Sequence, residues 1–471
     1  LAIAARSCTV NIRRTNNPLP DKHCCYDPMT PPSSMMVLMT SRPQCLPTAP
    51  IDFELLPRSA EVDLAGRLRV GGVDVLDAAQ EFGTPLFLYD EDEIRASFRE
   101  AVAVFGEGVA YATKAFLTPA VARIAAQEGM SFDVSTAGEY ACCRRVGVPA
   151  SRLVLHGNNK QPEELRLAVE EGPQWIVVDN FDELERLTAI TEELQREVNI
   201  LVRANPGIEV HTHRYIATGN RDSKFGFPAW NEDANRAIEQ VKKAPFLKFL
   251  GVHMHIGSFV LALDTFIKAL EAAAPLFDHH HPEIFVVGGG LGMRYLNGDE
   301  CPTFREWGEA ITGWGRRRFP GSRILAEPGR TMVARAGITL YTVGVVQRKG
   351  ERVFVAVDGG MSDNPRPVLY GSGYEVFSAS APLALRDLTI RLVGRHCESG
   401  DTLLEEGHLP AGITVGDIVC TPVTGAYGYS MASNYNLVPR AAVVFVSGGK
   451  ARITTRRETL EDLFAREVDG E

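Results

Sequence analysis

The chain has 471 residues, of which 45% are hydrophobic and 23% are charged, a composition typical of a soluble globular protein long enough for two domains. No apolar run approaches membrane-spanning length, so we expect no membrane partner. A net charge of −10 supplies no basic face for nucleic-acid phosphates, so we expect no nucleic-acid partner either. The nine cysteines show no obvious pairing pattern, which favours a reduced, cytoplasmic chain.

Residues 1–50 differ from the rest of the chain. They contain four of the nine cysteines, many prolines and few acidic residues. They could form a targeting peptide, but their apolar residues are too interrupted for a signal-peptide core. We expect a disordered extension, with little order before Ile51.

From residue 85 onward, the chain repeats an apolar strand, a polar loop and an amphipathic helix. A strand at 85–90 and a helix at 93–105 come first. Eight further strands are expected at 109–114, 131–134, 153–157, 175–179, 200–205, 249–258, 284–290 and 323–327. Helical patterns lie between them at 119–128, 137–146, 162–171, 181–194, 231–243, 265–277 and 304–318. Eight strand–helix repeats predict an α/β fold with a parallel (β/α)8 barrel over 85–330, and an open doubly wound sheet is the alternative.

Polar residues close nearly every predicted barrel strand. They are Lys114, Asp133, His156, Arg203, His255 and Glu327, after the first, second, third, fifth, sixth and eighth strands. The carboxyl ends of barrel strands converge on one mouth, where such enzymes keep their active sites. Solvated strand tips would explain one such residue more readily than the whole set.

Lys114 ends a short apolar run of β-branched, aromatic and small residues. Burial of an ammonium group lowers its pKa unless the group is paired. A lysine in this place therefore either extends outward to water or serves as a nucleophilic amine.

Glycines follow the seventh strand, at Gly288, Gly289 and Gly290. Bare backbone amides there could bind a phosphate, which barrels often hold after strands seven and eight. A tight turn is the alternative, but Ser258 and Arg330 follow neighbouring strands and would add donors to the same region.

An amine, a phosphate site and a carboxylate at one mouth match the needs of pyridoxal phosphate. Lys114 can condense with its aldehyde, Glu327 can keep its pyridine nitrogen protonated, and His255 can support the face of the ring. His253 and His255 share a strand face and could also suit a metal. No third ligand lies at a favourable place in the sequence, so we expect no metal.

Several motifs resemble those of the fold-type III pyridoxal-phosphate decarboxylases, in the family's order. They are YATKA at 111–115, HGNNK at 156–160, HIGS at 255–258, GGGLG at 288–292 and EPGR at 327–330. NPRP at 364–367, LYG at 369–371, CESGD at 397–401 and the stretch 425–436 resemble diaminopimelate decarboxylases in particular. The match runs from about residue 51 to residue 464 and implies a TIM-like barrel of the alanine racemase type.

The resemblance implies that Lys114 holds the cofactor, His255 stacks on its ring and Glu327 pairs with its nitrogen. It places Ser258, Gly290, Arg330 and Tyr427 at the phosphate. The substrate's distal carboxylate would contact Arg330, Arg366 and Tyr370, with Tyr427 close by. Glu398 of a second subunit would bind the distal amine, and Cys397 would lie beside the reacting carbon. Asp133, His156, Arg203, Gly288 and Gly289 complete the cofactor-binding set predicted from the strand ends.

Beyond residue 331 the pattern changes to strands without helices. We expect strands at 337–347, 353–358, 388–393, 417–421, 441–447 and 451–455, and a closing helix at 458–464. Residues 58–77 also show short strand patterns. Together these segments predict a discontinuous, mostly antiparallel β domain over 51–84 and 331–471.

The resemblance implies decarboxylation of meso-2,6-diaminopimelate to L-lysine and carbon dioxide, the last step of lysine biosynthesis by the diaminopimelate route. It also implies a homodimer with shared active sites. A decarboxylase of another basic amino acid or of carboxynorspermidine would not need the distal arginines. A racemase would need a proton donor on each ring face, and a non-catalytic homologue would be expected to lose Lys114 or Glu327.

Overall fold

The computed structural model describes residues 49–208, 219 and 221–468. The prediction of a disordered extension over 1–50 falls almost wholly outside these ranges. Within them, the structure contains no helix that is both long enough and apolar enough to cross a membrane.

Eight parallel strands form one sheet in the order β13-β12-β11-β9-β8-β7-β6-β5. Their bounds are Ala110–Ala112 (β5), Ser131–Val134 (β6), Leu153–Leu155 (β7), Trp175–Val178 (β8), Val198–Asn205 (β9), Leu247–His253 (β11), Ile284–Val286 (β12) and Arg323–Leu325 (β13). Backbone hydrogen bonds from Ala110 N to Ala326 O (3.1 Å) and from Ala112 N to Pro328 O (3.0 Å) join the two edges. The predicted barrel is therefore confirmed, and the open-sheet alternative is wrong.

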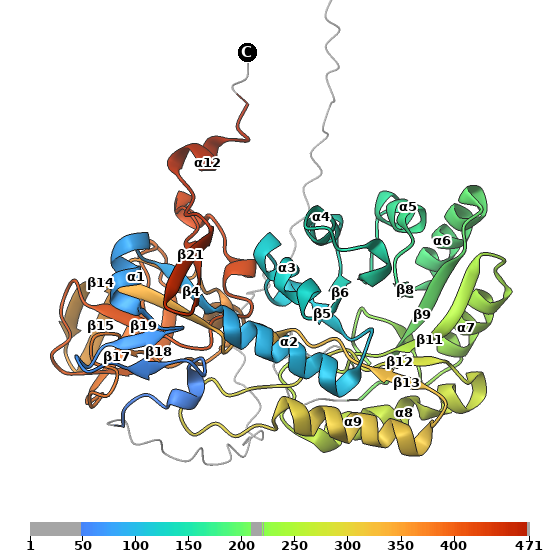
Figure 1. Ribbon diagram of the computed structural model, residues 1–471, viewed down its shortest axis with the longest axis horizontal. Helices are drawn as coiled ribbons and strands as arrows, with labels where there is room; N and C mark the ends of the chain where they lie inside the picture. Colours follow the sequence, from blue (N-terminus) through green and yellow to red (C-terminus); the bar gives the residue numbers. More distant parts are fainter. Residues whose placement is uncertain (1–48, 209–218, 220, 469–471) are drawn as a thin grey trace, which may run out of the picture. The chain divides into compact units, whose positions relative to one another are not determined.

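Helices follow the barrel strands and lie outside them, as Figure 1 shows. They are α3 (Pro119–Gln127), α4 (Ala137–Arg145), α5 (Pro162–Glu171), α6 (Phe181–Leu194), α7 (Asp233–Lys243), α8 (Leu263–His280) and α9 (Phe304–Arg318). Side-chain caps fix the starts of several of them: the Asn180 side chain accepts from Glu183 N at the start of α6, and Thr303 forms a capping box with Glu306 at the start of α9.

Apolar side chains fill the inside of the barrel. One buried cluster draws on seven of its strands and comprises Ala110, Val154, Trp175, Val177, Leu201, Leu250, Ile284, Val286 and Leu325. A packed barrel interior leaves room for ligands only at its ends, so polar residues at the carboxyl ends of the strands lie where a cavity can form.

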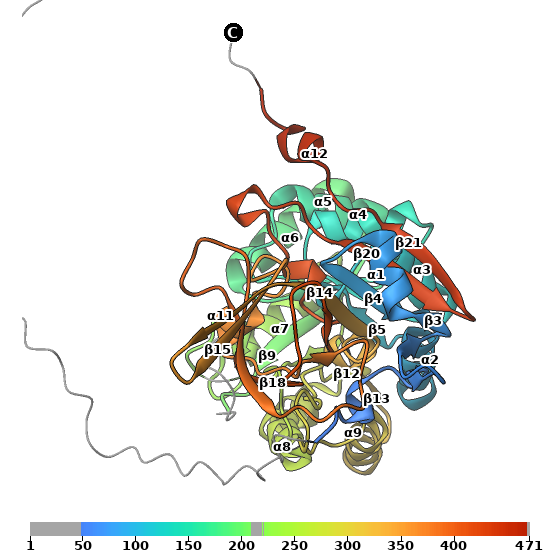
Figure 2. The same ribbon diagram turned by 90° about the vertical axis from the view of Figure 1, so that its left-hand side faces the viewer.

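A second sheet is built mainly from the C-terminal part of the chain, in the order β18-β17-β15-β14-β4-β20-β21, with β19 and β16 attached through β14. Its strands are β4 (Leu86–Asp90), β14 (Gly337–Lys349), β15 (Arg352–Val357), β16 (Phe377–Ser378), β17 (Leu388–Val393), β18 (Thr402–Leu409), β19 (Ile418–Thr421), β20 (Ala442–Ser447) and β21 (Lys450–Thr455). Most pairs are antiparallel, as predicted, but β15 with β17 and β4 with β20 are parallel. Figure 2 shows β20 and β21 beside β4.

The N-terminal segments differ in part from the prediction. The strand expected at 85–90 is β4, which pairs with β14 in the second sheet and not with the barrel. Residues 61–74 form a separate three-stranded sheet of β1 (Glu61–Val62), β2 (Leu68–Val70) and β3 (Val73–Asp74), followed by α1 (Val75–Phe82). The helix α2 (Glu91–Phe105) leads from β4 into the barrel, and α12 (Leu460–Phe464) follows β21. The division into domains at residues 85 and 330 stays a prediction.

The loop after β19 contacts the barrel where the first barrel strand ends. Tyr427 N donates to Ala115 O at 2.8 Å, and Ser430 Oγ donates to the same oxygen at 3.0 Å. Ala115 belongs to η2 (Thr113–Ala115), the short helical turn that contains Lys114. These bonds hold the loop from the second sheet beside Lys114.

A buried ion pair fixes the loop after β7. Lys160 Nζ donates to Glu183 Oε1, Gly157 O and Val177 O, each at 2.7 Å. The two charged side chains are 1% and 0% exposed. Because all three ammonium protons have acceptors, the loop that begins at His156 is held against α6.

We predict that Lys160→Met lowers the free energy of unfolding by about 3 to 5 kcal/mol, because it leaves the Glu183 carboxylate buried without its partner. Denaturant unfolding of the purified protein measures the change. The double variant Lys160→Met/Glu183→Leu should be more stable than the single one, since no uncompensated charge remains. The control Lys268→Met removes an exposed ion pair with Asp264 and should leave the midpoint unchanged. A single variant as stable as wild type would contradict the structural role of this pair.

Candidate active site

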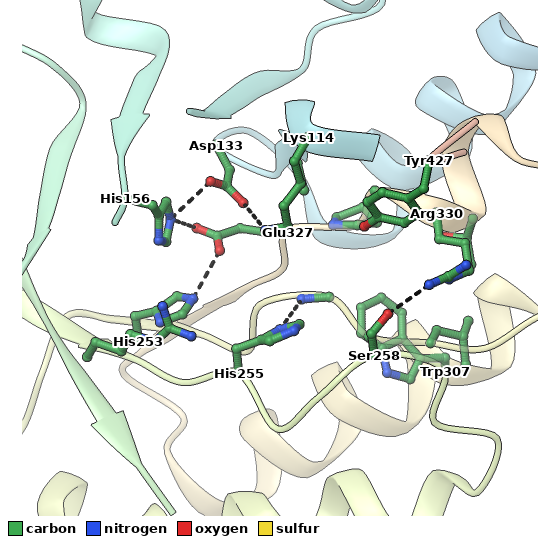
Figure 3. Close-up of a pocket in the computed structure, with 18 residues that line it drawn as sticks. Lys114, Asp133, His156, His253, His255, Ser258, Trp307, Glu327, Arg330 and Tyr427 are labelled. Atoms are coloured by element: carbon green, nitrogen blue, oxygen red, sulfur yellow. Dashed lines mark hydrogen bonds and ion pairs between the residues drawn. The ribbon is translucent and has the colours of Figure 1, made fainter. Parts of the chain in front are cut away.

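A cavity opens at the carboxyl ends of the barrel strands (Figure 3). Its deeper part is lined by Ala112, Lys114, Asp133, His156, Arg203, His253, His255, Ser258, Gly289, Gly290, Leu291, Trp307, Glu327, Pro328, Gly329, Arg330, Thr331 and Tyr427. Its outer part adds Arg366, Tyr370, Met431 and residues of the loop after β7. The convergence predicted for the polar strand ends is therefore present in the structure.

Lys114 projects into the cavity from η2, with its side chain about half exposed. Its Nζ lies 3.5 Å from Asp133 Oδ2. Asp133 raises the pKa of Lys114, and this effect outweighs burial, which alone would lower it. In the absence of a bound molecule the amine is therefore held as an ammonium ion facing the cavity. The lysine is paired, so the lower pKa expected for an unpaired buried lysine does not apply.

Glu327 lies between two histidines. His156 Nε2 is 2.9 Å from Glu327 Oε1, and His253 Nε2 is 3.0 Å from Oε2. One ligand atom from each of these three side chains lies within 4.8 Å of the other two, so the structure does supply a third candidate metal ligand that was not evident in the sequence. A metal would have to displace both hydrogen bonds to the carboxylate. His255 is not part of this group.

His255 lies two residues beyond the end of β11, because the strand predicted to reach residue 258 ends at His253. Gly289 N is 3.3 Å from its Nδ1, a geometry in which the ring accepts the amide proton. Burial, with Lys114 and Arg203 nearby, places the pKa of His255 well below its usual range. The ring is therefore neutral.

The glycines after β12 allow two chain segments to approach closely. A Cβ atom on Gly288 would lie 2.6 Å from His255 Nδ1, and one on Gly289 would lie 2.5 Å from Glu327 O. Gly289 and Gly290 line the cavity, whereas Gly288 packs behind His255. Close packing explains the need for glycine here, and it brings the backbone next to the cavity.

Arg330 and Arg366 are buried guanidinium groups for which the described part of the chain provides no carboxylate partner. Arg330 donates to Tyr295 Oη at 2.9 Å and to Ser258 Oγ at 3.0 Å, and its Nε has no partner there. Arg366 donates to the Tyr374 hydroxyl. Buried charges without counter-ions are costly, so this pair indicates a site for anionic groups.

Trp307 gives a further donor at the cavity. Its side chain is fully buried, and its indole N–H has no acceptor among the described residues. Together with the free Nε of Arg330, it fits a bound phosphate or carboxylate better than an apolar ligand.

Arg203 lines both parts of the cavity. Its Nη1 lies 3.4 Å from Asp179 Oδ1, and its guanidinium stacks over the Phe225 ring with Cζ at 4.4 Å from the centroid. Arg203 is therefore already paired with a carboxylate, whereas Arg330 and Arg366 have no such partner within residues 49–208, 219 and 221–468.

Two tyrosines reach the cavity from the C-terminal part of the chain. Tyr427 adopts a positive φ of 61° and lies under the guanidinium of Arg330, with Cζ 4.9 Å from the ring centroid. Tyr370 ends α11 (Arg366–Tyr370) and lines the outer part of the cavity. Their positions agree with the predicted set of contacts, whose individual roles stay predictions.

Cys397 and Glu398 are exposed and line neither part of the cavity of their own chain. Glu398 Oε1 instead accepts from Gly400 N at 3.1 Å. The structure therefore does not bring these two predicted residues to the other site residues within one chain.

The loop that carries them is nevertheless firmly held. Asp401 accepts from His396 N at 2.8 Å and from Met361 N at 2.6 Å, and His396 Nε2 lies 2.8 Å from Ser362 Oγ. Asp401 and His396 are both buried. The exposed tip at 397–400 is thus fixed to the loop that leads into Arg366.

Sequence reasoning missed Tyr295, Tyr374 and Trp307, and it gave His253 no role except in a metal site. Tyr295 lies between Arg330 and Arg366, with its ring centroid 5.9 Å and 4.8 Å from their Cζ atoms. These contacts join residues far apart in the chain, so no local spacing announces them. Only the position of Tyr295 shortly after the glycine cluster could have drawn attention to it.

Residues 91–334 match the family model described as pyridoxal-dependent decarboxylase, pyridoxal binding domain. The barrel, the cavity lysine and the opposing carboxylate are those of a pyridoxal-dependent decarboxylase.

Comparison with individual relatives identifies the family within this class of decarboxylases. The diaminopimelate decarboxylase of Bacillus subtilis is 44% identical over 84% of this chain and 94% of its own length, and that of Mycobacterium tuberculosis is 40% identical over 88% and 97%. The crystal structure of the Helicobacter pylori enzyme complexed with L-lysine superposes with a TM-score of 0.77 at 31% identity, covering 83% of this chain and 98% of that one. The M. jannaschii enzyme gives a TM-score of 0.80 at 29% identity, covering 88% and 98%. The chain belongs to the diaminopimelate decarboxylase family.

Proposed function

We propose that this chain uses pyridoxal phosphate to decarboxylate meso-2,6-diaminopimelate to L-lysine and carbon dioxide, as the last step of lysine biosynthesis. The observation that carries the proposal is a pair of buried guanidinium groups, Arg330 and Arg366, in the cavity that Lys114 faces, to which no described residue offers a carboxylate. One anion from a cofactor and one from a substrate would neutralise them. The L-lysine bound by the Helicobacter pylori relative is the product of this reaction.

The residues present fit the cofactor. Lys114 offers the amine for its aldehyde, Glu327 offers a carboxylate for its ring nitrogen, and Arg330 with Ser258 offers donors for its phosphate. Two buried donors, Arg330 Nε and Trp307 Nε1, have no acceptor among the described residues, which supports an anion at this place. When bound, pyridoxal phosphate supplies a conjugated ring that takes up the electron pair left by the departing carboxylate.

The chain's own residues divide the remaining work. His255, neutral and held by Gly289 N, presents a flat ring to the cavity. Lys114, whose Nζ is paired with Asp133 Oδ2 at 3.5 Å, and Cys397 are the two candidates for returning a proton to the reacting carbon. Arg366 and Tyr370, in the outer cavity, would bind the distal carboxylate and so orient the substrate.

We further propose that the protein acts as a cytoplasmic homodimer in which Glu398 and Cys397 complete the partner's cavity. Support comes from their exposure on a rigidly held loop and from their absence from the cavity of their own chain. The five described cysteines are free thiols, which agrees with a reducing compartment.

The substrate is tested by measuring carbon dioxide released from meso-diaminopimelate, L-lysine and L-ornithine. A substrate without a distal carboxylate leaves a buried guanidinium unpaired at a cost of about 3 to 5 kcal/mol, so kcat/KM for diaminopimelate should exceed the others by at least about a hundredfold. Arg366→Gln should reduce this preference. The control Arg391→Gln, which removes a surface ion pair with Glu405, should not. Comparable values for ornithine and diaminopimelate would refute the assignment.

Subunit sharing is tested by mixing two inactive variants, Lys114→Ala and Glu398→Ala. After random exchange, heterodimers have one site with both defects and one with neither, so about a quarter of wild-type activity should return. A mixture of Lys114→Ala with Glu327→Gln is the matched control. Both of its defects lie in the barrel, so it should stay inactive. If mass spectrometry shows exchange while the first mixture also stays inactive, the site is not shared in this way.

A further inference from the structure

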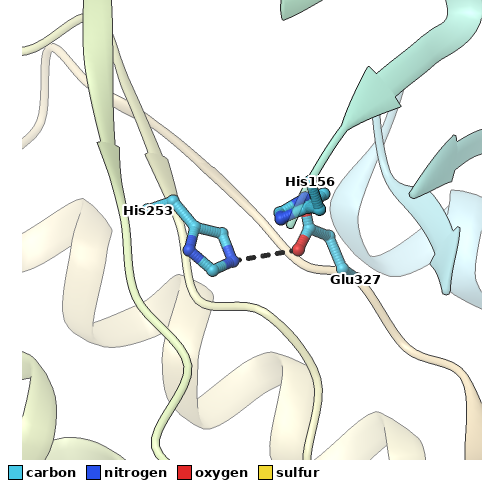
Figure 4. A group of neighbouring side chains, drawn as sticks. All are labelled: His156, His253 and Glu327. Carbon is cyan, nitrogen blue, oxygen red and sulfur yellow. Dashed lines mark hydrogen bonds and ion pairs between the residues drawn. The ribbon is translucent and has the colours of Figure 1, made fainter. Parts of the chain in front are cut away.

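The carboxylate of Glu327 is held at both oxygens by neighbouring histidines (Figure 3), and Figure 4 shows the bond to His253. His156 comes from the loop after β7, His253 is the last residue of β11, and Glu327 follows β13. The Nε2 atoms of the histidines lie 2.9 Å and 3.0 Å from Oε1 and Oε2, respectively. All three side chains are at least nine-tenths buried, so water does not compete for these hydrogen bonds.

The surroundings of the His253 ring show which of its two nitrogens carries the proton. His253 Nδ1 is buried and has no partner among the described residues. A protonated imidazole would leave an N–H there without an acceptor, whereas a neutral ring with its proton on Nε2 leaves only a lone pair. Burial lowers the pKa of His253 to about 4, which agrees with the neutral form.

Glu327 is the negative member of this group. Burial alone would raise the pKa of its carboxyl, but the two histidines outweigh that effect and place the pKa well below its usual range. A carboxylate that accepts good hydrogen bonds remains ionised even where desolvation opposes the charge.

Other charged groups also face this cluster. Asp133 Oδ1 lies 3.7 Å from His156 Nε2, and Asp133 in turn pairs with Lys114. Arg203, which pairs with Asp179, and the neutral His255 complete the surroundings. Since the Nε2 of His156 is closer to Glu327 than to Asp133, its N–H is directed to Glu327.

We propose that His156 and His253 are positioning residues that keep Glu327 ionised and fix the direction of its oxygens, so that the ring nitrogen of bound pyridoxal phosphate stays protonated. This inference rests on the proposed function. It gives a role in that reaction to His253, which had none before. Without the two N–H donors, the buried carboxyl group would gain proton affinity and would hold the proton itself. The ring nitrogen would then lose its charge, and the cofactor would become a weaker acceptor of electrons.

The test uses holoenzyme loaded with pyridoxal phosphate that carries ¹⁵N in the ring. The ¹⁵N chemical shift distinguishes a protonated from an unprotonated ring nitrogen and does not depend on turnover. The variants are His253→Leu and His156→Leu, which remove one donor each, and His253→Gln, whose amide can still donate. His280→Leu is the matched control, because His280 is a buried histidine that does not line the cavity.

We expect wild type, His253→Gln and His280→Leu to show the protonated shift, and the two donor-deleting variants to move toward the unprotonated value. In those two variants kcat should fall about tenfold to a hundredfold, as expected for one lost hydrogen bond to a charged group, while KM stays nearly constant. If one leucine variant fails to fold, the other gives the same reading. If both fail to fold, His253→Asn replaces them, because its shorter amide cannot reach the carboxylate. We expect this variant to show the unprotonated shift.

A protonated shift in every folded donor-deleting variant would overturn the inference. So would a stoichiometric divalent metal in wild-type holoenzyme, since a metal would need the same nitrogen and oxygen atoms. Failure of the wild-type protein to bind pyridoxal phosphate would instead overturn the proposed function, so the two failures are distinguishable.

Discussion

Two buried guanidinium groups, those of Arg330 and Arg366, have no carboxylate partner in the described part of the chain, and they make this side of the cavity positively charged. Burying an unpaired charge is expensive, and proteins usually avoid it. Here the fold holds Arg330 and Arg366 around Tyr295, with hydroxyl groups and aromatic faces instead of counter-ions. The positive charges of the two arginines favour binding of an anion. They also lower the pKa of Tyr295 in spite of its burial. A ligand with acidic groups would remove this cost on binding.

The opposite wall of the cavity carries negative charge. Glu327 and Asp133 lie there, and Figure 3 shows Lys114 between them and Arg330. This separation suits a molecule with a cationic ring nitrogen at one end and an anionic phosphate at the other. The elements that create it come from both parts of the chain, because Glu327 and Arg330 follow β13, whereas Arg366, Tyr370 and Tyr427 belong to the C-terminal segments. The hydrogen bonds from Tyr427 and Ser430 to Ala115 O hold the C-terminal loop beside the barrel residues of the cavity.

Repetition explains why the barrel was predictable from sequence. Each strand is a short run of apolar residues. The helices α5, α6 and α9 are amphipathic and begin at capping interactions, so they were predicted with the bounds the structure gives. The strand ends at residues 253 and 286 were placed too late, because the polar and glycine-rich loops that follow still contain apolar residues. The strand β18 was missed because Glu405, Glu406 and Gly407 interrupt its pattern.

The site was predictable where its residues close strands or form motifs, as with Lys114, Glu327 and Arg330. It was not predictable where its contacts are long-range. The bond between His253 and Glu327 joins residues 74 positions apart, and that between Tyr295 and Arg330 joins residues 35 apart. The pairing of β4 with β14 is of the same kind, since alternation shows that a strand exists and not which sheet it joins.

Whether Lys114 holds the cofactor is tested most directly by borohydride reduction of the protein loaded with pyridoxal phosphate, followed by peptide mass spectrometry. The phosphopyridoxyl mass should be found on the peptide that contains Lys114, at close to one group per chain. A label on another lysine, or none in protein that retains its fold, would contradict the assignment of this cavity as the active site.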